Sequence, residues 1–201
     1  MSDTEITPLI WPRTSTFWER AAPGLGLGIR ERDGNAPEIP YRLAASFDLM
    51  AALLADADLA GVLTLVAERA APMAGAAAAF IALPGAAYHT LSVDIAIGLN
   101  ADRIRGLTVR VGTSVIGRVF TTRRALASRV AANSPLKGVP TGPILLLPLD
   151  TGERTCGVLA VAGRSRDIAF SGSAQRQLML FASTSAVMIE MAEERRGHDL
   201  S

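Results

Sequence analysis

The spacing of apolar residues predicts two helices between residues 41 and 74. From Tyr41 to Ala55 the apolar positions recur at intervals of four, three and four, which is the stripe of an amphipathic helix: Leu43, Phe47, Met50 and Leu54. Asp58 is a suitable N-cap for a second helix that extends to about Ala74. The apolar stripe of that helix is Leu59, Val62, Leu63, Val66 and Ala70.

From residue 76 onward the pattern becomes that of β-strands. Residues 77–83 form a short apolar run that stops at the turn signal Pro84-Gly85. Residues 88–97 alternate, and we expect one set to face the core: His89, Leu91, Val93, Ile95 and Ile97. These two runs predict a β-hairpin. Residues 144–149 and 156–162, joined by the polar turn 150–154, predict a second hairpin.

Shorter elements occupy the middle of the chain. They are a helix at 101–104, an extended segment at 107–111, a helix at 114–122 and a short strand at 126–130. Residues 131–143 are rich in Pro, Gly and Ser and predict a long loop. A last helix spans about 173–196. This order predicts an α+β fold, an antiparallel central sheet of about five to six strands flanked by helices.

The last helix carries two neighbouring apolar stripes. One has the three-four-three-four spacing of a coiled-coil seam: Leu178, Phe181, Ser185, Met188 and Ala192. Beside it lies the second: Leu180, Thr184, Val187 and Met191. One stripe suffices to pack on the sheet, so the other predicts a further partner. We expect a homodimer formed through helix 42–55 and the first of these stripes, and an output domain or partner protein contacted through the last helix.

Residues 1–40 differ from the rest of the chain. They contain five of the 11 prolines and show no lasting apolar period, which predicts a poorly ordered arm. Trp11, Phe17 and Trp18 lie in this arm, and they are expected either to dock on the domain or a second subunit, or to bind a partner. The folded domain is therefore predicted at 41–196, with a tail at 197–201.

Composition limits the function further. A chain of 201 residues that is 49% hydrophobic can bury the core of one domain. A net charge of +1 and 5% aromatic residues argue against nucleic-acid and anionic-lipid partners. One cysteine excludes an internal disulfide and a cysteine-based zinc cluster, and the two histidines lack a metal-ligand spacing. Without a signal peptide or an apolar run of membrane length, the protein is expected in the cytoplasm, and its arginine and alanine bias suggests a GC-rich bacterium.

Four segments occur in an order and spacing that one family of signalling domains shares. They are helix 58–76 leading into AAAFIAL, Ile97-Gly98-Leu99 followed by the glycine-rich stretch 107–119, the Leu147-Pro148-Leu149 and Cys156–Val161 hairpin, and the closing helix after Phe170-Ser171. Over residues 45–196 the chain thereby resembles the GAF domain family, the small-molecule sensor modules of signalling proteins. The resemblance implies a GAF/PAS-like fold.

The resemblance also implies a ligand pocket between the sheet and the long connection. By position its lining would be Phe80, His89, Leu91, Ser128, Arg129, Asn133, Ser134, Leu136 and Thr141. Arg129 would pair with an anionic ligand, or else be a surface charge. The alternative is a collapsed pocket, since domains of this kind also serve only in dimerisation and relay. No catalytic residue and no metal site is assigned.

Several reactions and cofactors known from the GAF family require residues that this sequence lacks. Reduction of free methionine sulfoxide uses several cysteines, and Cys156 alone cannot both attack and resolve. The same residue, at the start of a central strand, is better read as a small buried hydrophobe than as a bilin attachment site. Haem-binding relatives place a histidine in the loop before the Pro-Leu strand, and loop 131–143 has none. Haem and bilin are therefore disfavoured, and the cofactor is left open.

The sequence thus predicts a non-catalytic small-molecule sensing or signal-relay domain of a bacterial signalling protein, with a two-component histidine kinase as the favoured parent. One alternative is the effector-binding domain of a transcription regulator, although residues 1–40 supply no helix-turn-helix. A small redox enzyme is the other, and the cysteine count argues against it. Because the chain stops just past the last helix, we expect an excised sensor region.

Overall fold

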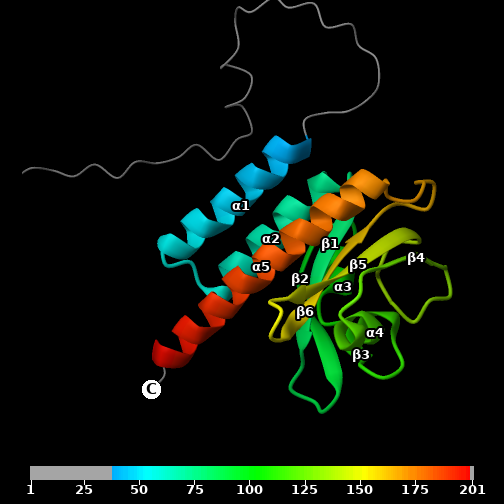
Figure 1. The fold of residues 1–201 in the computed structure, drawn as a ribbon. Helices are drawn as coiled ribbons and strands as arrows, with labels where there is room; N and C mark the ends of the chain where they lie inside the picture. The colour runs from blue at the N-terminus through cyan, green and yellow to red at the C-terminus, as the bar shows by residue number, and fades with distance from the viewer. Residues whose placement is uncertain (1–37, 200–201) are drawn as a thin grey trace, which may run out of the picture. The chain divides into compact units, whose positions relative to one another are not determined.

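One antiparallel sheet of six strands organises the structure (Figure 1). This computed structural model describes residues 38–199, so the predicted arm lies almost wholly outside the described residues. The strands run in the order β3-β2-β1-β6-β5-β4. They are β1 (Ala78–Pro84), β2 (Thr90–Gly98), β3 (Thr108–Arg110), β4 (Leu126–Val130), β5 (Gly142–Asp150) and β6 (Thr155–Ala162). The helices are α1 (Glu38–Leu54), α2 (Leu59–Met73), α3 (Ala101–Ile104), α4 (Val115–Thr122) and α5 (Gly172–Asp199). The α+β prediction is confirmed.

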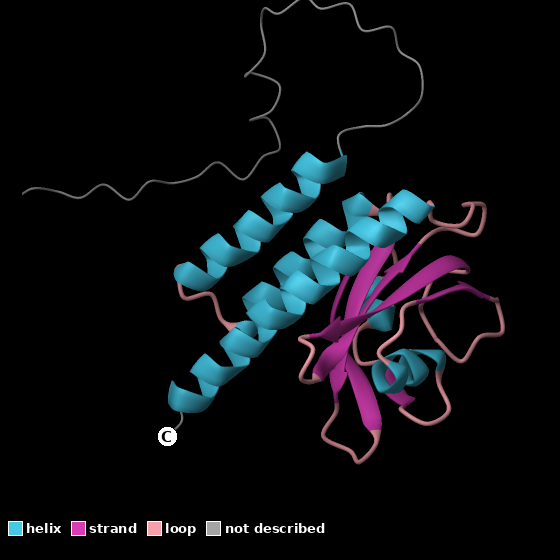
Figure 2. Cartoon of the chain, in the orientation of Figure 1, coloured by secondary structure: helices cyan, strands magenta, loops and turns pink. Residues whose placement is uncertain are grey.

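Helices cover both faces of the sheet (Figures 1 and 2). The helical layer consists of α1, α2 and α5, with α2 and α5 against the sheet and α1 packed outside them. The distal layer consists of α3, α4 and the loop 131–141 on the opposite face. No helix within residues 38–199 is long and apolar enough to cross a membrane.

The central strands are buried on both sides, which explains their unbroken apolar sequences. In β1, Ala79, Ile81 and Leu83 face the helical layer. The intervening Ala78, Phe80 and Ala82 face the distal layer. Strands β5 and β6 show the same two-sided burial. A strand that contacts water on neither face has no position for the polar residues that usually alternate with apolar ones.

Strand β2 departs from the predicted alternation. Its pairing with β1 shifts register between Ile81 and Ala82, so that Asp94 has no partner across the ladder. This β-bulge reverses the facing of the residues beyond it. Leu91 and Val93 therefore lie in the distal core, whereas Ile95 and Ile97 pack against the helical layer. The prediction that all of them share one buried face is wrong.

Helix α1 buries a second apolar stripe and not the one that the sequence spacing marks. Its buried residues are Ala45, Leu49 and Leu53, which pack into the core of the helical layer. The larger stripe predicted from the sequence is exposed: Leu43, Phe47, Met50 and Leu54. An arginine from the far end of α5, Arg195, donates a hydrogen bond to the carbonyl oxygen of Leu53 at 2.5 Å. The ends of α1 and α5 therefore lie together, and the two helices run in the same direction (Figure 1).

Helix α4 begins with a cap and a close backbone contact. The hydroxyl of Ser114 accepts a hydrogen bond from the amide of Gly117 at 2.9 Å, which satisfies one free donor of the first turn. A Cβ atom on Gly117 would lie 2.2 Å from the carbonyl oxygen of Val111. Only glycine allows this helix to approach β3 so closely.

Replacing Gly117 by alanine should therefore lower the free energy of unfolding by about 1–3 kcal/mol, as overpacking against backbone does. Helix propensity alone would give the opposite sign, a gain of about 1 kcal/mol. Gly112 is the matched control, because nothing lies within 4 Å of a Cβ placed there. Gly112→Ala should stay within about 0.5 kcal/mol of wild type in urea denaturation. Equal stabilities for the two variants would contradict the close contact.

Candidate functional site

The region where the resemblance implies a pocket is filled by the protein's own side chains. Phe80, Leu91 and Leu136, three of the predicted lining residues, are buried in the distal core. They pack there with residues of every distal element, among them Ile104 of α3 and Ile116 of α4. These three residues lie in one cluster, as predicted. Their side chains pack within this core and do not line an open cavity.

The loop 131–141 closes this core from outside. Its Leu136 and Val139 are buried, and the side-chain Nδ2 of Asn100 donates a hydrogen bond to the carbonyl oxygen of Gly138 at 3.1 Å. Gly138 has a φ of +85°, and a Cβ atom there would lie 2.6 Å from the carbonyl oxygen of Arg103. A left-handed glycine thus lets the loop lie directly on the end of α3. The polar Ser134 supports the same loop, accepting a hydrogen bond from the amide of Leu136.

The remaining predicted lining residues are exposed: His89, Ser128, Arg129, Asn133 and Thr141. His89 precedes β2, in the β1–β2 turn, where it has a φ of +53° and its ring contacts that of Tyr88. The inward position predicted for His89 is therefore wrong, because the strand begins one residue later. The Arg129 guanidinium donates to the backbone carbonyls of Ser165 and Asp167, at 2.6 and 3.3 Å. Arg129 thereby joins the edge strand β4 to the loop before α5. This placement fits the alternative interpretation of Arg129 as a surface charge.

The predicted dimer stripe of α5 belongs to the core of the monomer. Leu178, Phe181, Ser185 and Ala192 are buried in the helical layer, and Met188 packs partly buried against them. The hydroxyl of Ser185 donates to the carbonyl oxygen of Phe181 at 2.8 Å, so its polar group is satisfied within the helix. These side chains are occupied by the sheet and the neighbouring helices, and the assignment of this stripe to a second subunit is corrected.

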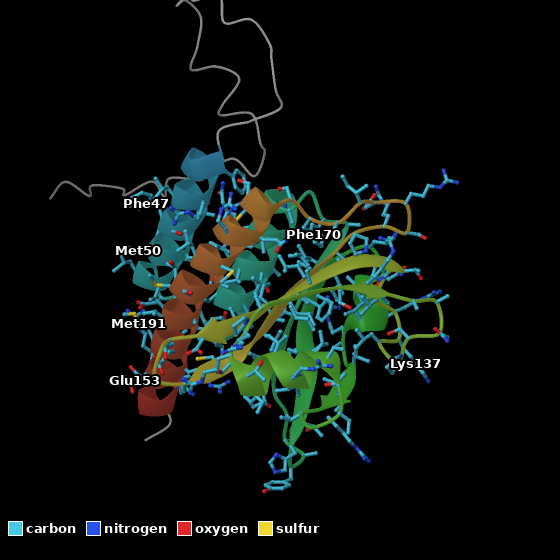
Figure 3. All side chains as sticks on the ribbon, turned by 45° about the vertical axis from the view of Figure 1, so that its right-hand side comes forward. Phe47, Met50, Lys137, Glu153, Phe170 and Met191 are labelled. Atoms are coloured by element: carbon cyan, nitrogen blue, oxygen red, sulfur yellow. The ribbon has the colours of Figure 1, made fainter. Side chains whose placement is uncertain are left out.

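The second stripe of α5 is the exposed one. Leu180, Val187 and Met191 are 42–56% exposed, with Thr184 half-buried between them. The exposed stripe of α1 lies on the same side of the helical layer (Figure 3). We call the combined surface the helix face: Leu43, Phe47, Met50, Leu54, Leu180, Thr184, Val187 and Met191. Figure 3 shows Phe47, Met50 and Met191 along the side of the helical layer that faces away from the sheet.

Two arginines hold the β5–β6 turn, residues 151–154. Arg154 donates through Nε to Glu190 at 2.7 Å and through Nη2 to Glu193 at 2.5 Å, both on α5. These hydrogen bonds raise the pKa of Arg154 above its usual value, so it is always charged. Arg123, at the end of α4, donates to the carbonyl oxygens of Gly152 and Glu153 at 3.1 and 3.0 Å. We call Arg123, Arg154 and the turn between them the arginine clasp.

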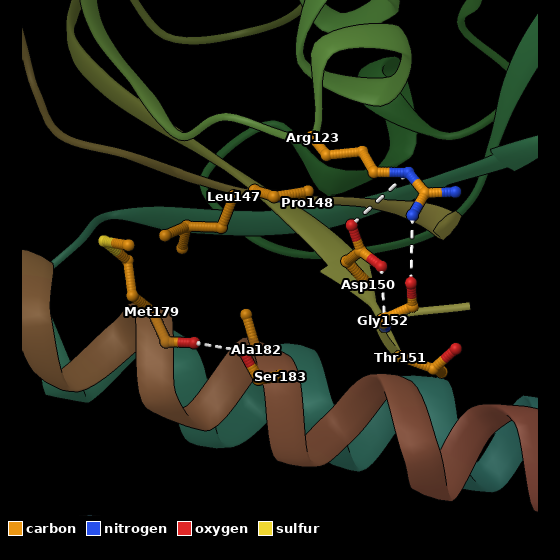
Figure 4. A pocket seen from close by; sticks show the side chains of 9 residues that line it. All are labelled: Arg123, Leu147, Pro148, Asp150, Thr151, Gly152, Met179, Ala182 and Ser183. Atoms are coloured by element: carbon orange, nitrogen blue, oxygen red, sulfur yellow. Dashed lines mark hydrogen bonds and ion pairs between the residues drawn. The ribbon is translucent and has the colours of Figure 1, made fainter. Parts of the chain in front are cut away.

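A groove of about 420 Å³ lies beside the clasp, between β5 and α5 (Figure 4). Leu147, Pro148 and Asp150 form one wall, and Met179, Ala182 and Ser183 of α5 form the other. Arg123 extends over the first wall, with its Nε 3.6 Å from Oδ2 of Asp150. Sequence reasoning missed the clasp, since its partners are about 30 to 39 residues apart and no local pattern signals them.

Comparison with known proteins identifies the fold. The family model for the GAF domain matches residues 56–190, which is more than half of the chain. This chain belongs to the GAF domain family. The GAF-B domain of DevS from Mycobacterium smegmatis is 27% identical, with a TM-score of 0.62 over 70% of this chain and 99% of that one.

Two more distant structures share the fold. The GAF domain from an Acinetobacter phosphoenolpyruvate-protein phosphotransferase has a TM-score of 0.66 at 16% identity, over 80% of this chain and 97% of that one. A free methionine-R-sulfoxide reductase from Neisseria meningitidis has a TM-score of 0.62 at 13% identity, over 82% and 97%. The GAF family is one of sensor and signalling domains, and at least one protein of this fold is an enzyme.

The chemistry of Cys156 bears on that enzymatic example. In this GAF domain Cys156 is 2% exposed, and it packs among the apolar side chains under α5. Burial raises the pKa of its thiol from about 9 to about 11. At neutral pH the sulfur is therefore protonated and shielded, whereas a nucleophilic cysteine needs an accessible thiolate. Among residues 38–199 no group of three metal-ligating side chains comes together.

Native protein at pH 8 should therefore react with a disulfide reagent such as DTNB at least about 100-fold more slowly than urea-unfolded protein, because the thiol must first be exposed. A Ser183→Cys variant provides the control, since Ser183 is exposed on α5 and its thiol should react in a separate fast phase. Fast labelling of the wild-type thiol would contradict the burial of Cys156.

Proposed function

We propose that this GAF domain is a non-catalytic relay module of a bacterial signalling protein, which dimerises through the helix face and passes a change in packing along α5. The observation that carries the proposal is the helix face itself. Seven large apolar side chains of α1 and α5 are at least 42% exposed along one side of the helical layer. Exposed apolar side chains gathered on one side of a domain are typical of a protein interface.

A second copy of the same chain fits this surface. The exposed residues of α1 and of α5 share the same four-three-four spacing, and the two helices run in the same direction. Two such pairs related by a twofold axis would form a four-helix bundle, in which each stripe meets its counterpart. The spacing matches the knobs-into-holes packing of coiled coils.

The closed distal core favours relay over tight ligand binding. Leu136 and Val139 of loop 131–141 occupy the space in which a ligand would be held, and they are 5% and 7% exposed. A domain with this packing can still transmit a change that a neighbouring module imposes on α1 or α5. Its signal is then a shift between two packing arrangements of the bundle.

The parent we favour is a sensor histidine kinase, with α5 as the connection to its output module. The similarity to a GAF domain of DevS from Mycobacterium smegmatis supports a bacterial signalling context. Helix α5 also suits this role, since it spans Gly172–Asp199 and its last core residue is Ala192.

Static light scattering tests the dimer. Wild type should have twice the chain mass of 21.1 kDa, and Phe47→Glu combined with Val187→Glu should reduce it to the chain mass. The reason is that each copy would place two charges in an apolar interface, at a cost of several kcal/mol. Circular dichroism should remain that of wild type, because both side chains are exposed in the monomer.

Ile168→Glu is the matched control. Ile168 is 87% exposed but lies in the loop before α5, so the same kind of substitution should leave the dimer intact. By contrast, Phe181→Glu should unfold the chain, since Phe181 is buried in the monomer core. A wild-type protein that is monomeric at high micromolar concentration would overturn the proposal.

A further inference from the structure

The arginine clasp connects elements that lie on opposite faces of the sheet. Arg123 is the C-cap of α4, which belongs to the distal layer, and Arg154 contacts α5 in the helical layer. Arg123 binds the short turn of the β5–β6 hairpin, and Arg154 belongs to that turn and binds α5. The turn therefore links the two layers through side-chain contacts.

The turn is held firmly enough to transmit such a displacement. Asp150 accepts a hydrogen bond from the amide of Gly152 at 2.8 Å, and Thr151 closes the hairpin with Arg154 through a 3.0 Å backbone bond. Arg123 donates to two successive carbonyl oxygens on the outside of this turn. Hydrogen bonds from a charged donor are stronger than neutral ones, and the planar guanidinium fixes their direction.

The end of α5 has little apolar contact with the core. Ala192 is the last α5 residue in the core, and residues 194–196 are exposed. Beyond the core, the contacts of this end include those of Arg154 with Glu190 and Glu193 and those of Arg195 with Leu53 and Asp56. A helix end with little buried apolar surface has low local stability, so its ionic contacts strongly influence its position.

We propose that the arginine clasp couples the distal layer to the output end of α5. Arg123 fixes the turn relative to α4, and Arg154 fixes the end of α5 relative to the same turn. A shift of α4 therefore changes the position and local stability of residues 190–196. Both arginines are positioning residues in this mechanism, and its use in signalling rests on the function proposed above.

Hydrogen–deuterium exchange of the full chain, read from peptides that cover residues 186–199, tests the coupling. Arg154→Gln removes both contacts with α5, and exchange there should become about three- to tenfold faster. Arg123→Gln should accelerate exchange in the same peptides, although Arg123 makes its hydrogen bonds to the turn and none of them to α5. This effect at a distance is the specific expectation of the proposal.

The double variant distinguishes coupling from two separate effects. If both arginines act through one turn, Arg123→Gln combined with Arg154→Gln should exchange no faster than Arg154→Gln alone. Arg154→Lys should give an intermediate rate, because a lysine keeps the charge but cannot hold both carboxylates in the fixed geometry of a guanidinium. Rates that multiply in the double variant would overturn the proposal.

Two exposed arginines provide controls. Arg118 lies on α4 and Arg176 on α5, and neither side chain has a hydrogen bond or ion pair within the described part of the chain. Arg118→Gln and Arg176→Gln should leave exchange at 186–199 unchanged. An unchanged rate in Arg123→Gln would refute the coupling, even if Arg154→Gln has its effect.

The outcome is independent of the dimer experiment, because every contact of the clasp lies within one chain. Light scattering on the same samples reports the mass separately. A monomeric wild type with coupled exchange would contradict the proposed dimer but support the coupling through the clasp. A dimer without coupled exchange would support the dimer and contradict the coupling.

Discussion

Burial of the central strands on both faces is the constraint on which the other features of this domain depend. Strands β1, β5 and β6 have almost no contact with water, so each of their side chains must fit between the sheet and a covering layer. The sequence meets this requirement by combining large residues with alanine, as in the run Ala78, Ala79, Phe80 and Ile81. Because protein interiors are closely packed, the position of each covering element depends on the volume of the residues beneath it.

The parts of the fold that local pattern determines could be predicted from the sequence. The two hairpins, the helices and the α+β class follow from apolar runs, alternation and turn residues. The bulge in β2 could not be predicted, since a single extra residue at Asp94 leaves no sequence signal and yet reverses the facing of Ile95 and Ile97. The misplacement of His89 follows from extending the alternation back into the turn.

The sequence pattern also could not predict which face of α1 and of α5 is buried. Both helices carry two apolar stripes, and periodicity alone does not say which of them faces the core. In each case the core takes the stripe that contains alanine or serine, with Ala45 in α1 and Ala182 and Ser185 in α5, because small residues allow close approach. The arginine clasp was beyond prediction for a different reason, since it joins residues that only the folded topology brings together.

The closure of loop 131–141 has a consequence for the binding of any small molecule in the distal core. Leu136 and Val139 would have to leave that core first, so the binding-competent form is a minor state of the protein. The apparent dissociation constant is the intrinsic one divided by the population of this form. An opening free energy of about 4 kcal/mol would therefore weaken binding roughly 1,000-fold. A partner that holds the loop open would remove this penalty, and the domain would then bind its ligand only in the assembled complex.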